Sequence, residues 1–245
     1  MLRTALGVVR SLGIYYGHPA RARAMDRLYA QFVGANDLVF DVGAHVGDRI
    51  ASFRRLGARV VAVEPQPALH RALRLLYGRD PRVTLVPAAV GRAAGTAEMK
   101  INPGNPTIST LSDAFIAATR GAAGWEGEAW PRTASVAVTT LDALVAAHGR
   151  PAFIKLDVEG FEAEALAALS QPAPALSFEF TAIQRSVAIT CLERCATLGY
   201  TEFSAAIGES QALNAWRNAQ AMADWLAGLP HEANSGDVYA RTTDF

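Results

Sequence analysis

The sequence predicts an α/β domain built on one doubly wound, mostly parallel sheet. From residue 37 onward, short apolar runs alternate with helical patterns. Strands separated by helices of about ten to fifteen residues are typical of parallel sheets with crossover helices. The 245 residues are 51% hydrophobic, which is enough for one sizeable core. No repeat or linker divides the chain, so we expect one domain over residues 37–245 after an N-terminal helical extension, 1–36.

The first part of the domain has three strand patterns, and each of the first two leads into a helical pattern. Apolar runs bounded by glycine or proline indicate the strands, and periodic apolar residues ended by glycine indicate the helices. The predicted strands are 38–42, 59–65 and 82–91, and the predicted helices are 48–57 and 67–78.

The alternation then breaks between two further strand patterns, 96–101 and 135–141. The segment between them, residues 102–133, is rich in glycine, proline, serine and threonine. A long irregular insertion in a compact domain is usually a functional loop or lid, or else disordered. Trp125 and Trp130 argue against simple disorder. We expect the insertion to lie over the active edge of the sheet, where the hydroxyls of "TISTLS" (residues 107–112) and the two tryptophans could shape an acceptor pocket. The alternative for the tryptophans is that they anchor the loop.

The alternation resumes in the last hundred residues. Here too, short apolar runs indicate strands and longer periodic patterns indicate helices. The predicted strands are 152–158, 175–180, 200–207 and 236–241, and the predicted helices are 141–149, 162–170, 187–199 and 211–229.

Charge and cysteine content exclude several classes of function. The 23 basic residues equal the 23 acidic residues, so no bulk field favours nucleic acid or an acidic membrane. Cys191 and Cys195 are expected to be reduced, buried thiols. No run approaches the roughly 20 apolar residues of a membrane span, and no signal peptide is apparent, so we expect a cytoplasmic protein. Residues 3–29 could form an amphipathic helix that touches a membrane or partner, but a packing helix is favoured.

The segment "VFDVGAHVGDRI", residues 39–50, indicates a ligand site at the end of the first strand. Asp41 ends an apolar run, and Gly43 and Gly47 follow it, where backbone could approach a ligand closely. Glu64 closes the second strand, 23 residues after Asp41. Ligands of open α/β sheets bind at these strand ends, and a carboxylate there can accept hydrogen bonds from ribose hydroxyls.

The charge of Asp41 narrows the class of ligand. A dinucleotide fold needs G-x-G-x-x-G for its pyrophosphate, whereas this loop reads Gly-Ala-His-Val-Gly. A carboxylate would repel phosphate but suits an ammonium group. S-adenosylmethionine carries adenosine and an amino acid without phosphate, so Asp41 is expected to help hold its methionine end. The alternative is that Asp41 caps the following helix.

These motifs resemble those of FkbM-type S-adenosylmethionine-dependent methyltransferases. The resemblance covers residues 37–181 and rests on "VFDVGAHVGDRI", "VVAVEPQP", "TLDAL", "FIKLDVEGFEAEAL" and "LSFEF", and "GDVYAR" is similar to the last strand of such proteins. It implies a class I methyltransferase, Rossmann-like fold, with seven strands and an antiparallel last strand. It also implies S-adenosyl-L-methionine as cofactor and O-methylation of sugars or polyketide hydroxyls.

The resemblance further implies which residues bind the cofactor. The matching positions lie in the glycine loop, at the end of the second strand and after the third strand. They are Asp41, Gly43, Ala44, His45, Gly47, Asp48, Glu64, Pro65, Ala88 and Ala89. Two residues depart from the family pattern: His45 stands where asparagine is expected, and Pro87 stands where a polar residue is usual.

The segment "FIKLDVEGFE" supplies the candidate catalytic residues Lys155, Asp157 and Glu159. Lys155 and Asp157 share one face of a strand. Asp157 or Glu159 could take a proton from the acceptor, and Lys155 could stabilise the developing alkoxide. The alternative is a structural ion pair beside a helix N-terminal carboxylate. Asp157 and Glu159 could alternatively bind a divalent ion, but two carboxylates without a clear third ligand favour a site without metal. Glu179 either lines the acceptor pocket or is a satisfied strand-end carboxylate.

The leading hypothesis is therefore an S-adenosylmethionine-dependent O-methyltransferase. Its expected partner is a small-molecule or glycan acceptor, such as a hydroxyl on a sugar or polyketide. A homodimer is an expected assembly, and neither nucleic-acid binding nor stable membrane insertion is expected. The alternatives are an NAD(P)-dependent oxidoreductase and a catalytically inactive binding subunit with a cofactor fold.

Overall fold

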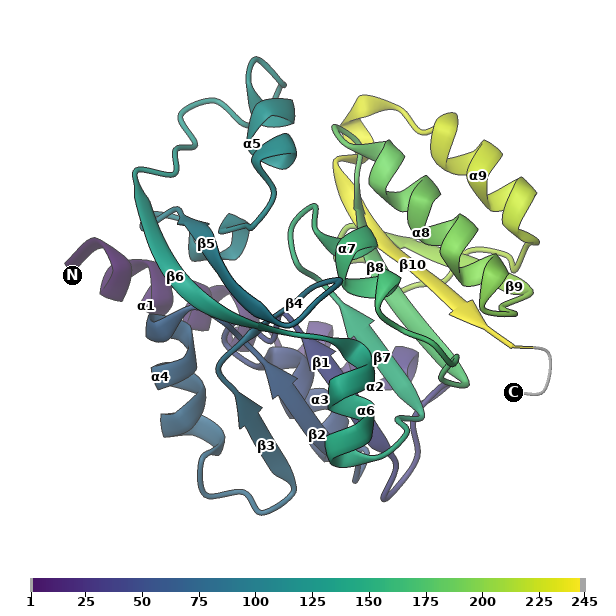
Figure 1. The fold of residues 1–245 in the computed structure, drawn as a ribbon, viewed down its shortest axis with the longest axis horizontal. Helices are drawn as coiled ribbons and strands as arrows, with labels where there is room; N and C mark the ends of the chain where they lie inside the picture. Colours follow the sequence, from purple (N-terminus) through teal and green to yellow (C-terminus); the bar gives the residue numbers. More distant parts are fainter. Residues whose placement is uncertain (1, 243–245) are drawn as a thin grey trace.

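The computed structural model describes residues 2–242 and shows a seven-stranded sheet with the order β3-β2-β1-β7-β8-β10-β9 (Figure 1). Strand β10 is antiparallel to both of its neighbours, and the other pairs are parallel. The predicted fold class, with its antiparallel last strand, is confirmed. The strands are β1 (Leu38–Val42), β2 (Arg59–Val63), β3 (Val83–Val86), β7 (Phe153–Leu156), β8 (Ala175–Thr181), β9 (Glu202–Ile207) and β10 (Ser235–Arg241).

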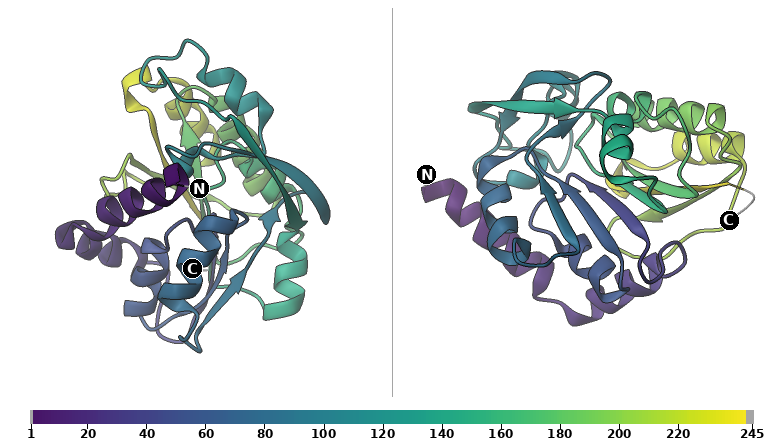
Figure 2. Two further views of the ribbon diagram at one scale, coloured as in Figure 1. Left: turned by 90° about the vertical axis from the view of Figure 1, so that its left-hand side faces the viewer. Right: turned by 60° about the horizontal axis from the view of Figure 1, so that its bottom comes forward.

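Helices cover both faces of this sheet because the strands are apolar on both sides. On β1, Val39 belongs to one buried cluster, whereas Phe40 and Val42 belong to the other. The first face carries α2 (Pro19–Tyr29), α3 (Asp48–Arg55) and α4 (Pro67–Tyr77). The second carries α6 (Leu141–His148), α7 (Glu162–Ala167), α8 (Arg185–Thr197) and α9 (Ala219–Ala227). Figure 2 shows the two sets of helices on opposite sides of the sheet.

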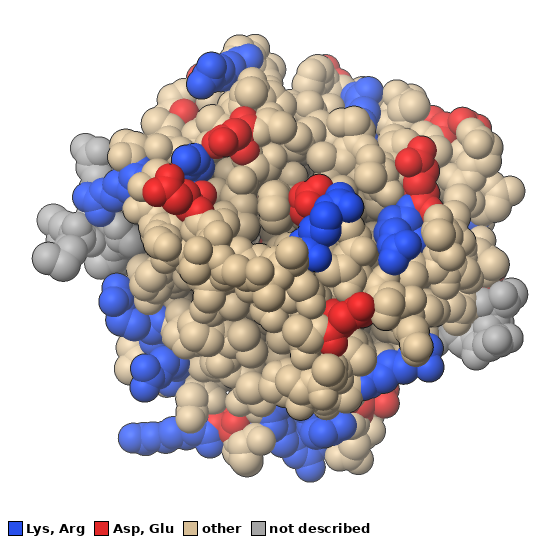
Figure 3. Space-filling model, viewed as in Figure 1, with Lys and Arg blue, Asp and Glu red and all other residues tan. Residues whose placement is uncertain are grey.

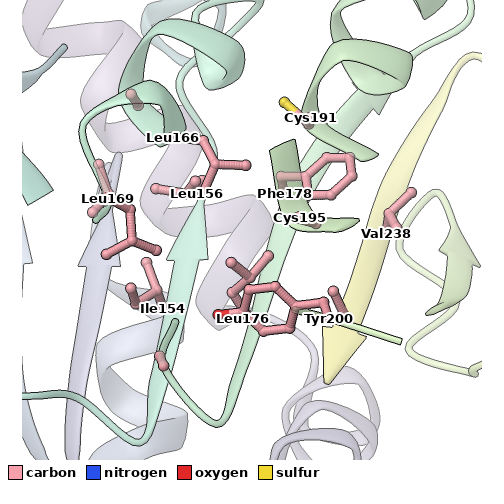
Figure 4. Close-up of a cluster of buried hydrophobic side chains, with 14 of the residues drawn as sticks. Ile154, Leu156, Leu166, Leu169, Leu176, Phe178, Cys191, Cys195, Tyr200 and Val238 are labelled. Carbon is pink, nitrogen blue, oxygen red and sulfur yellow. The ribbon is translucent and has the colours of Figure 1, made fainter. Parts of the chain in front are cut away.

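The largest buried cluster extends along the second face of the sheet, and Figure 4 shows the part of it between β7, β8 and β10 and the helices α7 and α8. Ile154, Leu156 and Phe178 point from the strands toward the helix layer. Cys191 and Cys195 on α8 complete the packing, and both are free and fully buried. Their expected state as reduced core thiols agrees with this position.

A second sheet, with the order β4-β6-β5, stands beside the carboxyl ends of the main strands (Figure 1). It consists of β4 (Ala89–Val90), β5 (Gly95–Ile101) and β6 (Arg132–Thr139). The single strand predicted over residues 82–91 is wrong, because the chain leaves the main sheet after β3. Pro87, which has no N–H to donate to a strand ladder, lies at this exit. The 102–133 insertion joins β5 to β6 and contains the 3-10 helix η1 (Pro106–Ile108) and α5 (Asp113–Thr119).

The long helix predicted over residues 211–229 is also wrong, because α9 begins only at Ala219. The side chain of Asn218 caps it by accepting a hydrogen bond from the backbone N–H of Ala221 at 2.9 Å. Upstream, Arg217 pairs with Phe203 of β9 in an isolated antiparallel bridge. The apolar residues before Asn218 therefore belong to an irregular segment. After α9 comes the 3-10 helix η2 (His231–Ala233).

The N-terminal helices α1 (Leu2–Tyr16) and α2 pack against the domain rather than projecting from it. Helix α1 contacts α4 and η1, and α2 contacts α3. Among residues 2–242, no helix combines the length and apolar character that crossing a membrane requires. On the face shown in Figure 3, basic and acidic side chains are interspersed without one continuous field of either sign.

Candidate active site

One pocket lies at the carboxyl ends of β1, β2 and β7, bordered by the second sheet and the insertion. It encloses about 840 Å³ of empty space, part of which is open to solvent. The predicted cofactor-binding and catalytic residues line it with the exception of Gly47, whereas Glu179, Trp125 and Trp130, the other candidates for the acceptor pocket, do not. The hydroxyls of residues 107–112 in the insertion were also expected at this pocket, and Thr107 and Ser109 line it. The sequence analysis missed further lining residues, which include Tyr15 on the N-terminal helix, Arg49 on α3, Gln66 after β2, Met99 on β5 and Glu209 after β9.

Glu64 sits at the end of β2 with its carboxylate already held by backbone. It is 3% exposed and accepts hydrogen bonds from the N–H groups of His45, at 2.9 Å, and Gln66, at 2.8 Å. Burial nevertheless raises the pKa of Glu64 to about 8. A carboxylate has about four acceptor positions, so this one keeps capacity for a ligand in the pocket.

Asp41 lies beside Glu64 on the neighbouring strand, since the register pairs Asp41 with Ala62 of β2. It is 1% exposed, and its Oδ2 atom is buried without a hydrogen-bond partner among the described residues. Burial raises the pKa of Asp41 to about 7. The alternative role as a helix cap does not apply, because the N-cap of α3 is Gly47. The unpartnered oxygen suits a ligand that brings a hydrogen-bond donor or a positive charge.

The two loop glycines are required by the protein's own packing. Gly43 has φ +84°, and a Cβ there would lie 1.7 Å from the backbone oxygen of Asp157. Gly47 has φ +85°, and its Cβ would lie 2.6 Å from the ring of Tyr77 and 2.8 Å from Leu73. The two glycines were expected to let the backbone approach a ligand closely. In the structure they are needed first so that the loop can pack against the end of β7 and against α4.

His45 adopts a backbone conformation that explains why asparagine is expected there. Its φ is +50°, in the left-handed region that asparagine tolerates better than most residues. The imidazole packs edge-on against Tyr15, with 5.3 Å between ring centroids, and its Nε2 lies 3.3 Å from Thr107 Oγ1. Burial lowers the pKa of His45 to about 4, so the ring is neutral at pH 7. The second departure, Pro87, is exposed and does not line the pocket.

An ion-pair network joins the N-terminal helices to the glycine loop. The Oδ2 atom of Asp48 accepts hydrogen bonds from Arg21, at 2.9 Å, and from Arg49, at 2.6 Å. Both arginines also reach Glu209, which lies after β9. The carboxylate of Asp48 is thus engaged by arginines, and residues 1–36 help to build the pocket through Arg21 and Tyr15.

Lys155 forms the centre of the other side of the pocket. It is 1% exposed, and its Nζ donates to Asp157 at 3.0 Å and to Asp237 at 2.8 Å. Burial opposes its charge, but the two carboxylates outweigh this effect and raise the pKa of Lys155. The sequence suggested an ion pair with Asp157 but missed Asp237, which β10 contributes from 82 residues away. Asp237, a carboxylate inside the predicted last strand "GDVYAR", was the available signal.

Glu159 and Glu179 crowd against this ion pair. Carboxylate oxygens of Asp157, Glu159 and Glu179 all lie within 4.8 Å of one another. Glu159 is 6% exposed, and its φ of +56° is uncommon for a residue other than glycine or asparagine. Burial and the nearby carboxylates raise the pKa values of Glu159 and Glu179. The structure therefore brings a third carboxylate to the two that were predicted.

The insertion contributes hydroxyls to the pocket, whereas its tryptophans act as anchors. Thr107 and Ser109 line the pocket, but Trp125 and Trp130 do not. Both indoles pack edge-on against Phe115, and Trp130 Nε1 donates to the backbone oxygen of Ile108 at 2.7 Å. Of the two interpretations of these tryptophans, the structure favours loop anchoring. The role of the insertion as a lid stays a prediction.

Comparison with known families decides the class of this protein. The model of the methyltransferase FkbM domain matches residues 41–228, which is more than half of the chain. The chain belongs to the FkbM methyltransferase family. It is thus an S-adenosylmethionine-dependent methyltransferase, and the oxidoreductase alternative falls away. The strand order of the main sheet agrees with the class I fold that the resemblance implied.

Solved structures of similar shape include other methyltransferases at low identity. A 1,6-didemethyltoxoflavin-N1-methyltransferase from Burkholderia thailandensis is 16% identical, with a TM-score of 0.45 over 99% of this chain and 88% of that one. A precorrin-6y C5,15-methyltransferase from Geobacter metallireducens is 14% identical, with a TM-score of 0.44 over 91% and 87%. A search of curated proteins found no match. The assignment rests on the family match and the strand order rather than on these similarities.

Proposed function

We propose that this FkbM methyltransferase transfers a methyl group to a hydroxyl of a sugar, glycan or polyketide-type small molecule. The observation that carries the proposal is that one pocket has two unlike sides. Its cofactor half is formed around Asp41 and Glu64, and its acidic half around Lys155, Asp157 and Glu159. Methyl transfer requires mainly that donor and acceptor atoms be aligned, and a shared pocket allows this.

The cofactor half suits S-adenosylmethionine, which supplies an electrophilic methyl group on sulfur. The unpartnered Oδ2 of Asp41 would accept from the ammonium of the methionine end. Glu64, already oriented by two backbone N–H groups, would accept from the ribose hydroxyls. Ala88 and Ala89 are buried, small and apolar, which suits the face of adenine. Gly43, Ala44, His45 and Pro65 would complete the contacts, with Gly47 and Asp48 shaping the loop.

The acidic half would receive the acceptor hydroxyl. Asp157 or Glu159 would accept its proton, because a base acts best when its pKa approaches the working pH. Burial and the neighbouring carboxylates raise the pKa of Glu159 above its ordinary value. Lys155 uses two of its three N–H donors on Asp157 and Asp237, so its charge is fixed in place to stabilise a developing alkoxide.

A methyl-transfer assay with labelled S-adenosylmethionine and hydroxyl-bearing acceptors tests the proposal. We expect label on oxygen, and turnover lower by about 10²-fold or more in Asp157→Asn or Glu159→Gln, the usual scale for a lost base. Glu164→Gln is the matched control, since Glu164 pairs with Arg92 at the surface. Label on nitrogen or carbon would refute hydroxyl methylation. Full turnover in both variants would refute the catalytic role of the acidic half.

A further inference from the structure

The three carboxylates of Asp157, Glu159 and Glu179 converge because of how the strands pair. In the parallel register of β7 and β8, Lys155 lies opposite Ser177 and Leu156 opposite Phe178. One further step places Asp157 beside Glu179. Glu159 follows two residues later in the loop before α7, and carboxylate oxygens of all three residues lie within 4.8 Å of one another.

Glu159 and Glu179 lack the partners that buried carboxylates normally have. The Glu159 side chain, 6% exposed and lining the pocket, makes no hydrogen bond or ion pair with any residue that the structure describes. The Oε2 atom of Glu179 is buried and likewise has no partner among them. By contrast, the neighbouring Glu162 accepts a hydrogen bond from the backbone N–H of Val158 at 2.9 Å. Unpartnered buried carboxylates require an explanation, such as a bound ion.

The cationic side chains that line the pocket do not balance the charge of these three carboxylates. Lys155 is shared between Asp157 and Asp237. The pocket arginine, Arg49, is bonded to Asp48 and Glu209. No cation within the described part of the chain therefore pairs with Glu159 or Glu179. A cation from solution would supply the missing charge.

We propose that Asp157, Glu159 and Glu179 form a binding site for one divalent cation of the Mg²⁺ or Mn²⁺ class. Carboxylate oxygens are the ligands that these hard cations prefer. Three protein ligands leave coordination positions free, and Asp157 and Glu159 place the site at the wall of the pocket. The free positions are thus available to water or to an acceptor oxygen.

The role of the cation in binding the acceptor rests on the proposed function. A divalent cation at the acidic half would bind the acceptor hydroxyl and favour loss of its proton, as metal ions do for bound water. Cation binding itself requires no acceptor. The two proposals can therefore fail separately.

A Mn²⁺ titration of the full chain, freed of metal with a chelator, tests the site directly. Bound Mn²⁺ loses the six-line electron paramagnetic resonance signal of the free ion, and Mg²⁺ can then be added as a competitor. We expect one saturable Mn²⁺ site per chain that Mg²⁺ displaces. Glu159→Gln and Glu179→Gln should each weaken Mn²⁺ binding at least about tenfold, since a lost ligand should cost no less than a lost supporting contact.

Glu164→Gln is the control, because it removes the same charge from an exposed carboxylate; Mn²⁺ affinity should change less than about twofold. Each variant is checked for folding by its binding of S-adenosylhomocysteine. Absence of saturable binding by the unaltered chain overturns the site without any variant, as does binding that survives both substitutions. Hydroxyl methylation that continues in EDTA would also overturn it and leave the proposed function intact. If the cation binds but only nitrogen or carbon is methylated, the proposed function is refuted and the cation site is supported.

Discussion

In the cofactor half of the pocket, Glu64 is held by two backbone N–H groups, whereas in the acidic half Glu159 has no partner among the described residues. Both side chains are almost fully buried. The difference lies in how each half is built. The cofactor half uses the two short loops after β1 and β2, whose amides at His45 and Gln66 donate to the carboxylate. The acidic half gathers Asp157 from just beyond β7, Glu179 from β8 and Asp237 from β10, and Lys155 bridges Asp157 and Asp237.

This contrast suggests that the balance of charge, more than backbone geometry, determines how stably the acidic half is folded. In the cofactor half, losing a carboxylate should weaken a ligand contact. In the acidic half, losing the single cation should destabilise the folded chain, because like charges remain buried together. The predictions that follow test this difference, beginning with the largest expected effect.

Lys155→Met should lower the free energy of unfolding by about 3–5 kcal/mol, the range for removing one partner of a buried ion pair. The physical reason is that two half-buried carboxylates, Asp157 and Asp237, would remain close together without the buried cation between them. Urea denaturation measures the change. Lys100→Met is the matched control, since Lys100 is more exposed and its ion pair with Glu98 is long, at 4.0 Å. The free energy of unfolding should change little in this variant.

Adding Asp237→Asn to Lys155→Met should recover part of the lost stability, because it removes one of the two orphaned charges. Equal stability of the double and single variants would show that Lys155 acts through packing. The comparison between the halves would then lose its electrostatic basis.

The cofactor half could be predicted from the sequence because its residues are local. The strand, glycine loop and Glu64 lie within 26 residues of one another, and both strand ends must meet at one edge of the sheet. The acidic half was predicted only where it is local, at Lys155, Asp157 and Glu159. Asp237 and the convergence of Glu179 depend on strand order and register, which no short segment encodes.

The same reasoning explains what was missed at the N-terminus. Arg21 and Tyr15 reach the pocket because α1 and α2 pack across α3 and α4, and their own segment shows only an amphipathic pattern. The misplaced start of α9 has a different cause. Asn218 was a readable cap signal, but the apolar periodicity upstream of it outweighed that signal.

Glu64→Gln should weaken binding of S-adenosylhomocysteine by about 1.5–3 kcal/mol, the range for hydrogen bonds to a charged group. The neutral amide would keep one acceptor but lose the second oxygen. Calorimetry measures the affinity. Glu159→Gln, in the acidic half, should leave it nearly unchanged. If the two variants bind equally well, Glu64 does not contact the ribose, and the division of the pocket into two halves is wrong.

The affinity for S-adenosylmethionine should rise with pH between about 5 and 7. Burial raises the pKa of Asp41 to about 7, offset in part by Lys155, so Asp41 is largely protonated at the lower pH. An ammonium ligand prefers the ionised carboxylate, and one linked proton allows at most about a tenfold change per pH unit. Calorimetry across this range should show a slope that Asp41→Asn abolishes.

The stability of the unliganded protein should change in the opposite direction. The folded pKa of Asp41 lies above its ordinary value of 3.8. The folded state therefore holds a proton that the unfolded state has released between about pH 4 and 7. Stability from this group is present at low pH and lost as the pH rises through that window. A cofactor affinity independent of pH would show that Asp41 does not hold the ammonium group.

Trp130→Phe should have the smallest effect, because it changes an anchor of the insertion outside both halves of the pocket. The substitution keeps an aromatic ring against Phe115 but removes the indole hydrogen bond to Ile108. Stability should fall by about 0.5–1.5 kcal/mol, the net value of one hydrogen bond. Trp125→Phe is the matched control, since its indole nitrogen donates no hydrogen bond within the described residues.

The Michaelis constant for the acceptor distinguishes anchoring of the insertion from recognition of the acceptor, because Ile108 lies between Thr107 and Ser109, which line the pocket. If loss of the anchor does not displace the hydroxyls of Thr107 and Ser109, the Michaelis constant stays unchanged in both variants. A rise confined to Trp130→Phe would show that the anchor positions the acceptor, and would extend the acidic half into the insertion.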